Sequence, residues 1–146
     1  MKTLLLLISP FLFLGTPIEK KNFKIDAPVI KREIRKHKGT NEYEVVVMIK
    51  KGALNGFASY KETLPENLNA TVNSSNYGDA NFSFKNGVVK FLWTALPGSK
   101  ELIFSYILTT DEKFDRNFPG VFKYVDDNIV AAATLKSENV SYKEVP

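Results

Sequence analysis

Hydrophobic and polar residues alternate along most of the chain after residue 42. In the segment 42–50, every second side chain is apolar or aromatic, and these positions are Tyr43, Val45, Val47 and Ile49. Successive side chains of a strand point to opposite faces of its sheet, so this segment is expected to be a half-buried strand. The segment 102–108 repeats the pattern. No window of about 12 residues carries the i, i+3, i+4, i+7 apolar stripe of a long helix.

Turn signals divide the alternating pattern into short strands. Asn86-Gly87 stands between two alternating runs, and this dipeptide favours a type I′ hairpin because both central residues need positive φ. A last hairpin is expected around Asp126-Asp127, and the polar segment 109–119 could hold one helical turn at 111–114 but nothing longer. The expected strands are 28–36 (the least certain), 42–50, 56–63 with Phe57 as its anchor, 80–85, 88–95, 102–108, 120–125 and 128–135, with a weak strand at 68–72. Val140 and Tyr142 could extend the end of the chain. Seven to nine short strands at this spacing predict an all-β sandwich or barrel.

The first 17 residues have the pattern of a signal peptide. Lys2 supplies a positive start, and the run from Leu4 to Leu14 is apolar apart from Ser9. This run is too short to cross about 30 Å of hydrocarbon. We therefore expect residues 1–17 to be a cleaved export signal, and 18–146 to be one β-sandwich domain. An uncleaved anchor or a buried first strand are the alternatives.

Composition narrows the range of functions. Hydrophobic residues make up 44% of the chain, which is enough for a real core. The chain has no cysteine, so disulfides, thiolate nucleophiles and Cys-ligated metal centres are excluded. The net charge of +4 is mild for 146 residues and does not indicate a nucleic-acid partner.

The stretch 45–108 carries a recognisable pattern. It has an acidic residue before Leu64-Pro65, the single tryptophan Trp93, then Leu96-Pro97-Gly98, and a strand that ends in Tyr106-Ile107-Leu108. With Glu62 as the acidic residue, this resembles the Ig-like conserved repeats of bacterial surface and envelope proteins. The resemblance implies an Ig-like antiparallel sandwich. One copy is present where such repeats often occur in tandem, which leaves both a spacer and an accessory protein open.

One local feature supports the Ig-like sandwich, and one departs from the family's pattern. A buried Trp93 would anchor one sheet on the other, because a tryptophan removes a large apolar area from water. The family usually has an Asn-x-Gly turn after its first long strand. Here Lys51-Gly52 and Asn55-Gly56 fill that region differently.

Catalytic side chains are scarce. His37 is the only histidine, so one chain cannot build a His-based triad or a multi-His metal site. We expect it in a surface loop. The carboxylates near the predicted turns fit Asx-type turn chemistry, although a glycosidase pair or a calcium site are alternatives. They are Asp111, Glu112, Asp115, Asp126 and Asp127. No nucleotide-binding glycine motif is present. We therefore expect no enzymatic activity, no cofactor and no metal.

Partner contacts are expected from loops and from one basic run. Tyr60, Tyr77 and Phe118 fall in or beside predicted loops, where an aromatic ring could anchor a protein or stack on a sugar. The run 31–38 contains Lys31, Arg32 and Arg35. It could touch anionic lipid or lipopolysaccharide phosphate, or it could be an edge strand whose charges prevent aggregation.

The sequence thus predicts an exported interaction or structural domain of the bacterial envelope, in the periplasm or at the cell surface. It would serve as an accessory subunit or adaptor of a larger assembly, with a protein partner and with no membrane span once the signal is removed. A carbohydrate-binding module or an adhesin-like surface domain, with a glycan partner, is the alternative.

Overall fold

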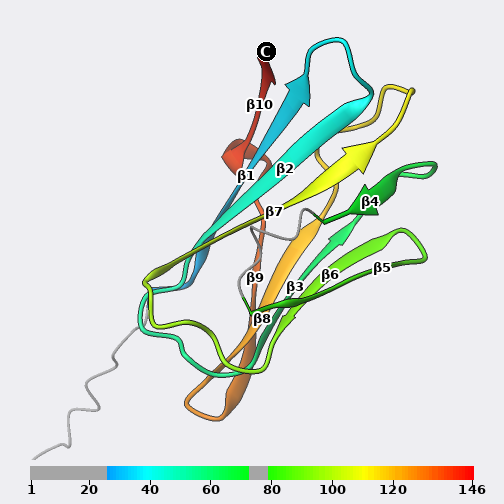
Figure 1. Ribbon diagram of the computed structural model, residues 1–146. Coiled ribbons are helices and arrows are strands. Elements are labelled where there is room, and N and C mark those ends of the chain that lie inside the picture. The colour runs from blue at the N-terminus through cyan, green and yellow to red at the C-terminus, as the bar shows by residue number, and fades with distance from the viewer. Residues whose placement is uncertain (1–25, 73–78) are drawn as a thin grey trace, which may run out of the picture.

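Two five-stranded sheets face each other in the computed structural model, which describes residues 26–72 and 79–146 (Figure 1). Sheet A has the order β10 (Val140–Val145), β1 (Val29–His37), β2 (Glu42–Lys50), β7 (Glu101–Thr109) and β4 (Asn69–Thr71). Sheet B has the order β5 (Asn81–Lys85), β6 (Val88–Trp93), β3 (Ala58–Thr63), β8 (Gly120–Asp126) and β9 (Ile129–Thr134). The all-β sandwich expected from the alternation is confirmed. The expected signal segment 1–17 lies outside the described residues.

Sheet A is built on the longest pairing in the fold. β2 and β7 run antiparallel from Glu42 opposite Thr109 to Lys50 opposite Glu101. Their apolar alternate positions face sheet B, which is why Val45, Val47, Phe104 and Leu108 are all buried. The strand phase read from the sequence is therefore correct for both segments.

The two predicted hairpins are present, one of them shifted. Asn86 and Gly87 have φ values of 53° and 76° and join β5 to β6, as the Asn-Gly signal predicted. The second hairpin joins β8 to β9, but its positive-φ residues are Asp127 and Asn128, at 47° and 62°. The turn thus comes one residue later than expected.

An aromatic cluster holds the two sheets together. Trp93 is 2% exposed, and its ring lies 5.1 Å from that of Phe104 across the sandwich. Phe91, two residues before it, lies 4.6 Å from the same ring. The expected burial of Trp93 is confirmed.

Several local expectations are wrong. Phe57 is 49% exposed and anchors nothing, because it precedes β3 and points out of the sandwich. The one helical turn that residues 111–114 could have held is not formed, which agrees with the expectation of nothing longer there. β1 is not an edge strand, because β10 pairs with it in parallel and a 3₁₀ turn, η1 (Ser137–Asn139), carries the chain up to β10. Within the described ranges, no helix has the length and apolar character needed to cross a bilayer.

Candidate functional site

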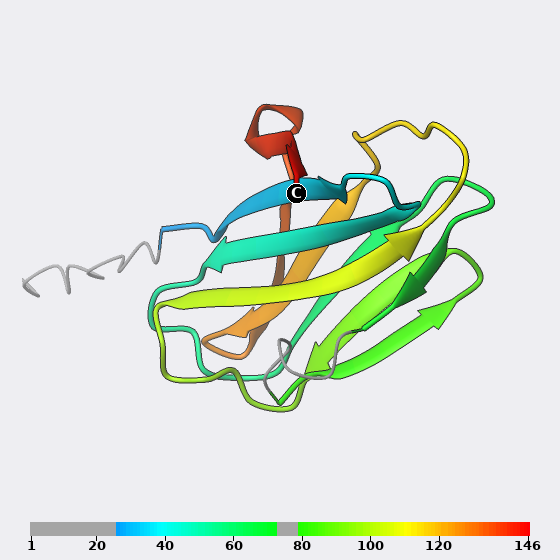
Figure 2. The same ribbon diagram turned by 45° about the horizontal axis from the view of Figure 1, so that its top comes forward.

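A groove opens at one end of the sandwich, where sheet A extends beyond the cover of sheet B. The register places Glu144 beside Lys36, and Lys36 beside Tyr43, in one row across β10, β1 and β2. The segment 110–119 leaves β7, arches over this end and enters β8 (Figure 2). The cavity holds about 600 Å³ and is lined by Lys36, Tyr43, Lys113, Phe114, Asp115, Arg116, Asn117, Tyr142 and Glu144. We call it the end groove.

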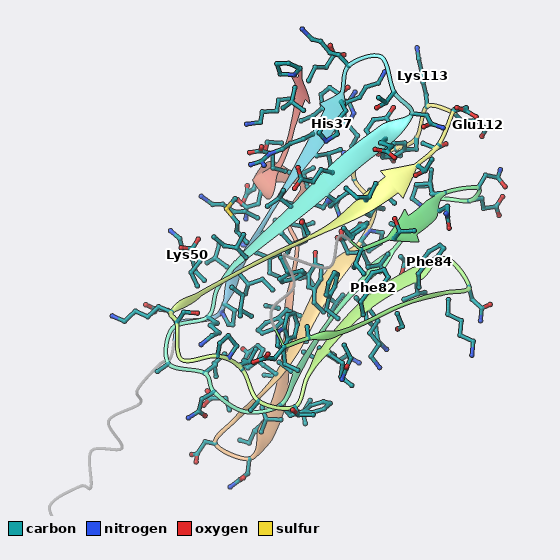
Figure 3. All side chains as sticks on the ribbon, in the orientation of Figure 1. His37, Lys50, Phe82, Phe84, Glu112 and Lys113 are labelled. Carbon is teal, nitrogen blue, oxygen red and sulfur yellow. The ribbon has the colours of Figure 1, made fainter. Side chains whose placement is uncertain are left out.

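The end groove lies at one pole of the molecule. Figure 3 shows His37, Glu112 and Lys113 at that end, with Lys50 at the other. His37 is the last residue of β1 and not a loop residue, so the expectation of a loop position is wrong. The pole is formed by the end of β1 and the start of β2, which are neighbours in the sequence, and by the arching segment, which is far from both.

Local hydrogen bonds fix the segment that closes the groove. The backbone N–H of Asn117 donates to Asp115 Oδ1 over 2.9 Å, and Asn41 Nδ2 donates to Asp111 Oδ1 over 3.1 Å. The backbone N–H of Thr110 donates to the carbonyl oxygen of Asn41 over 3.0 Å. Asp115 therefore serves turn geometry, which is the role that the sequence favoured, whereas Asp111 ties the segment to the turn between β1 and β2.

Arg32 holds the same segment from inside the sandwich. Its guanidinium donates to the carbonyl oxygens of Arg116 and Phe118, at 2.5 and 2.9 Å. It also lies 3.7 Å from the centre of the Phe118 ring. Arg32 is thus a positioning residue for the end groove, because it fixes the backbone of Arg116, whose side chain lines that groove.

Arg32, Tyr60 and Phe118 were expected as surface contacts, and that placement is wrong. Their exposed fractions are 1%, 0% and 5%. Arg32 shares the inward phase of Ile30 and Ile34 on β1, so it points into the core.

The partner of Arg32 in the core is Glu62, which is fully buried and ion-paired with it. Burial raises the pKa of the Glu62 carboxyl above its usual value of 4.5, although the charge of Arg32 acts in the opposite direction. The Tyr106 and Tyr60 hydroxyls beside the carboxyl also lower its pKa, but burial has the larger effect. Sequence reasoning used Glu62 only as part of a motif and missed the pair.

The surroundings of this pair are tightly packed. A Cβ at position 120 would collide with the Tyr60 hydroxyl oxygen, so Gly120 is required where β8 passes the cluster. Burial raises the pKa of the Tyr60 and Tyr106 hydroxyls well above their usual value of 10.0. Both tyrosines therefore stay neutral, and the cluster is suited to holding structure.

The other predicted contact residues do not gather at one site. Lys31 is exposed on the outer face of sheet A. Arg35 is on the same face, where it pairs with Glu33 at 2.5 Å and with Glu44 at 3.8 Å. Tyr77 lies outside the described residues. In the described part of the chain, no group of three or more His, Asp or Glu side chains could hold a metal ion.

Comparisons with known proteins give shape and little else. No protein-family model matches the chain, and no curated protein matches its sequence. Among solved structures, the chitin-binding domain ChBD2 of Thermococcus kodakarensis KOD1 is similar with a TM-score of 0.46 and 15% identity, over 69% of this chain and 90% of that one.

A non-cellulosomal cohesin from Archaeoglobus fulgidus has a TM-score of 0.44 and 13% identity, over 81% of this chain and 92% of that one. The GH20 exo-β-N-acetylglucosaminidase of Vibrio harveyi, as its D437A inactive mutant, has a TM-score of 0.49 and 8% identity, over 81% of this chain and 18% of that one. No ligand or partner follows for this chain from likenesses at this level.

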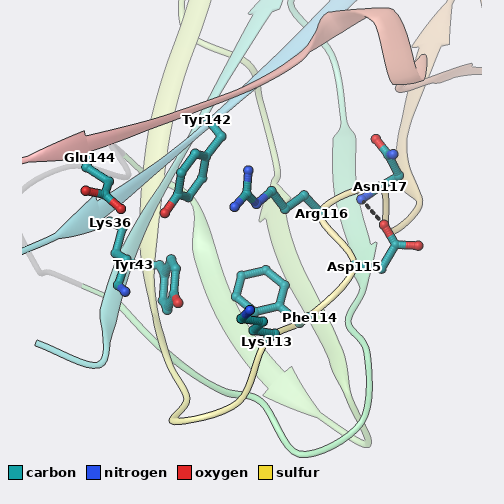
Figure 4. A pocket seen from close by; sticks show the side chains of 9 residues that line it. All are labelled: Lys36, Tyr43, Lys113, Phe114, Asp115, Arg116, Asn117, Tyr142 and Glu144. Atoms are coloured by element: carbon teal, nitrogen blue, oxygen red, sulfur yellow. Dashed lines mark hydrogen bonds between the residues drawn. The ribbon is translucent and has the colours of Figure 1, made fainter.

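The rings in the end groove are already engaged. The Arg116 guanidinium lies 3.3 Å from the centre of the Tyr142 ring. Figure 4 shows these two side chains next to each other. Tyr43 meets Phe114 edge to face at 5.0 Å, and Lys36 Nζ lies 5.9 Å from the Tyr43 ring. The groove therefore presents cations supported by aromatic rings, and not a free aromatic platform.

The charges of the end groove favour a negative ligand. Lys36, Lys113 and Arg116 face two carboxylates, Asp115 and Glu144. Within residues 26–72 and 79–146, none of these three cations has a carboxylate within ion-pair distance. A ligand with a carboxylate or another anion can therefore pair with them without breaking an existing bridge.

Proposed function

We propose that this chain is a non-enzymatic binding domain that holds an acidic segment of a protein partner in the end groove. The observation that carries the proposal is the set of three cations without ion-pair partners, two of which lie against aromatic rings. A carboxylate placed among them is stabilised by charge and by partial exclusion of water.

The edge position of β10 supports a protein ligand. Among the strands of residues 26–72 and 79–146, β10 pairs only with β1, so its other side leaves backbone N–H and C=O groups for an added strand. β10 also supplies Tyr142 and Glu144 to the groove. An extended segment can therefore pair with β10 while it places an acidic side chain beside Arg116 and Lys36.

A neutral sugar is a poorer fit to the end groove. Carbohydrate modules of the kind considered above rely on ring faces that are free to stack, and here Arg116 lies against Tyr142. A carboxylate-based hydrolase is also a poorer fit. Figure 4 shows Asp115 and Glu144 at opposite ends of the groove, and Asp115 already accepts the Asn117 N–H.

We place the domain in the bacterial envelope. The apolar run that follows Lys2 supports export, and the Leu64-Pro65, Trp93 and Leu96-Pro97-Gly98 pattern supports an Ig-like envelope module. The role is that of an accessory subunit or adaptor. Amino-terminal sequencing of the protein recovered from the envelope tests the export step, and an intact residue 1 there would contradict a cleaved signal.

The groove is tested with a defined peptide pair. A fluorescent peptide of alternating Glu and Val should bind, and the matched Lys–Val peptide should not. In the variant K36Q/R116Q the affinity should fall by about tenfold or more, since two charge-assisted contacts are lost. The control K38Q/K100Q removes the same charge from two exposed lysines outside the groove.

Photocrosslinking in the native envelope gives the second readout. A crosslinker at Lys113 should capture a protein partner that is lost in K36Q/R116Q, whereas a crosslinker at Lys100 should not. Equal binding of the two peptides, or equal loss in both double variants, contradicts the groove as the site.

A further inference from the structure

The outer face of sheet B carries one sign of charge. Alternate positions of each strand point away from the core, as the exposed Lys61 and Thr63 do on β3. The outward charged residues of the sheet are Lys61, Lys85, Lys90 and Lys123. No outward position of its five strands holds Asp or Glu.

The register arranges these lysines in a diagonal line. Lys90 on β6 is directly opposite Lys61 on β3. Lys85 on β5 is opposite Val88, one outward position before Lys90, and Lys123 on β8 is opposite Ser59, one outward position before Lys61. With strands about 4.8 Å apart and about 3.3 Å per residue, the line from Lys85 to Lys123 spans roughly 20 Å. We call this line the lysine stripe.

The stripe opposes stability and is not neutralised. Like charges directly opposite on neighbouring strands repel each other. On sheet A a similar pair, Arg35 opposite Lys143, is bridged by Glu33 at 2.5 and 3.1 Å. In the described part of the chain, no carboxylate lies within ion-pair distance of a stripe lysine. An added anion can therefore pair with the stripe without breaking an ion pair of the described residues.

We propose that the lysine stripe binds a linear acidic polysaccharide, in a site separate from the end groove. A line of charges about 20 Å long across a rigid sheet fits an extended polymer that carries regularly spaced carboxylates. Thr63 and Ser83 occupy exposed outward positions beside the lysines. Their hydroxyls suit hydrogen bonding to sugar hydroxyls.

Two other polyanions fit this face less well. Single-stranded nucleic acid needs aromatic rings on which its bases stack, and no outward strand position of sheet B is aromatic. The exposed apolar side chains of Ile129 and Val130 would favour contact with an anionic membrane. The adjacent turn residues Asp126 and Asp127 would oppose that contact.

The test uses polygalacturonate as the probe and neutral dextran as its control, in affinity gels at low salt. The protein should be retarded by polygalacturonate and not by dextran. K61Q/K90Q should weaken binding by about tenfold or more, and log affinity should depend less steeply on log salt concentration. The matched control K31Q/K50Q, which removes two exposed lysines from the outer face of sheet A, should change affinity by less than about twofold.

The remaining arms separate the other outcomes. Retardation by dextran, or an equal loss in both double variants, overturns the proposal. So does stripe-dependent binding to phosphatidylglycerol vesicles or to an oligo-dT strand in the absence of polygalacturonate binding. The groove variant K36Q/R116Q should bind polygalacturonate as the wild type does, so failure of one site is distinguishable from failure of the other.

Discussion

Arg32 and Arg35 lie three residues apart on β1, and their surroundings are opposite. Arg32 points between the sheets, pairs with Glu62 and is shielded from water. Arg35 points outward, pairs with Glu33 and Glu44, and keeps 34% of its side chain exposed. The difference follows from strand phase alone, since an odd step along a strand reverses the face.

The contribution of an ion pair to folding stability depends on whether water surrounds its charges. Outside, water and salt screen the pair, and its loss changes stability little. Inside, both charges have lost their hydration, so removal of one partner leaves the other charge buried and unpaired. Arg32 also holds the backbone of Arg116, so the interior pair affects the shape of the end groove.

The largest expected effect comes from removing each arginine in turn. Arg32→Ala should lower the free energy of unfolding by about 3–5 kcal/mol, because Glu62 is left as an uncompensated buried charge. Arg35→Ala should lower it by about 0–1 kcal/mol. Urea denaturation followed by Trp93 fluorescence measures both. Similar losses of unfolding free energy in the two variants would contradict the difference between the interior and the exposed arginine.

The second test replaces the whole interior pair. Arg32→Met combined with Glu62→Leu should recover most of the stability lost in Arg32→Ala, since well-packed apolar residues can replace a buried pair without loss. Hydrogen exchange should nevertheless increase in residues 111–118, because the bonds to Arg116 and Phe118 are gone. Unchanged protection there would show that Arg32 does not position the groove.

The third test uses pH, which should affect the two pairs in opposite directions. The pKa of Glu62 is raised by burial, so its favourable protonation in the folded state is complete below 4.5 and is lost as pH rises through the folded pKa. Wild-type stability relative to Glu62→Gln should therefore fall as pH increases from about 4.5.

Glu33 provides the opposite case. The hydrogen bond from Arg35 lowers its pKa below 4.5, so its contribution is present above that pH and is lost on acidification through the folded pKa. Wild-type stability relative to Glu33→Gln should therefore decrease as pH falls. Denaturation curves between about pH 3 and 8 measure both differences. The same sign for the two glutamates would contradict the assignment of inside and outside.

The smallest expected effect concerns the outer faces of the two sheets. K61Q/K90Q removes a direct like-charge opposition and should raise the free energy of unfolding by about 0.2–1 kcal/mol. K31Q/K50Q, on the mixed-charge face of sheet A, should leave it nearly unchanged. Thermal melts of the two variants side by side measure this. Destabilisation by K61Q/K90Q would mean that the two lysines already have partners in the folded chain.

Local patterns predicted the strands well because alternation and turn chemistry are local properties. Asn86-Gly87 indicates a turn from its own backbone preference alone. Trp93 continues the alternating apolar positions Val89 and Phe91. Arg32 was misplaced because its charge was weighted above the phase set by Ile30 and Ile34. The alternation alone would have shown that Arg32 points inward. Its pairing with Glu62 could not be predicted in this way, because Glu62 lies on the other sheet.

The end groove could not be predicted, because it depends on pairings between distant segments. β10 joins β1 in parallel, and no local signal in residues 140–145 indicates this neighbour. The groove then needs residues 113–117 to be held across that end by Arg32. The lysine stripe lies between these cases. The outward phase of Lys61 and Lys90 can be read from alternation, but their direct opposition requires the register.

The parallel pairing of β1 and β10 also determines how the domain bears mechanical load. A pull toward the start of β1 and an opposite pull toward the end of β10 act along two adjacent strands, in contact from Arg32 beside Val140 to His37 beside Val145. The two strands are then loaded in shear, so all of these pairs resist the force at the same time. A hairpin pulled at its two open ends would instead separate rung by rung under a much weaker force.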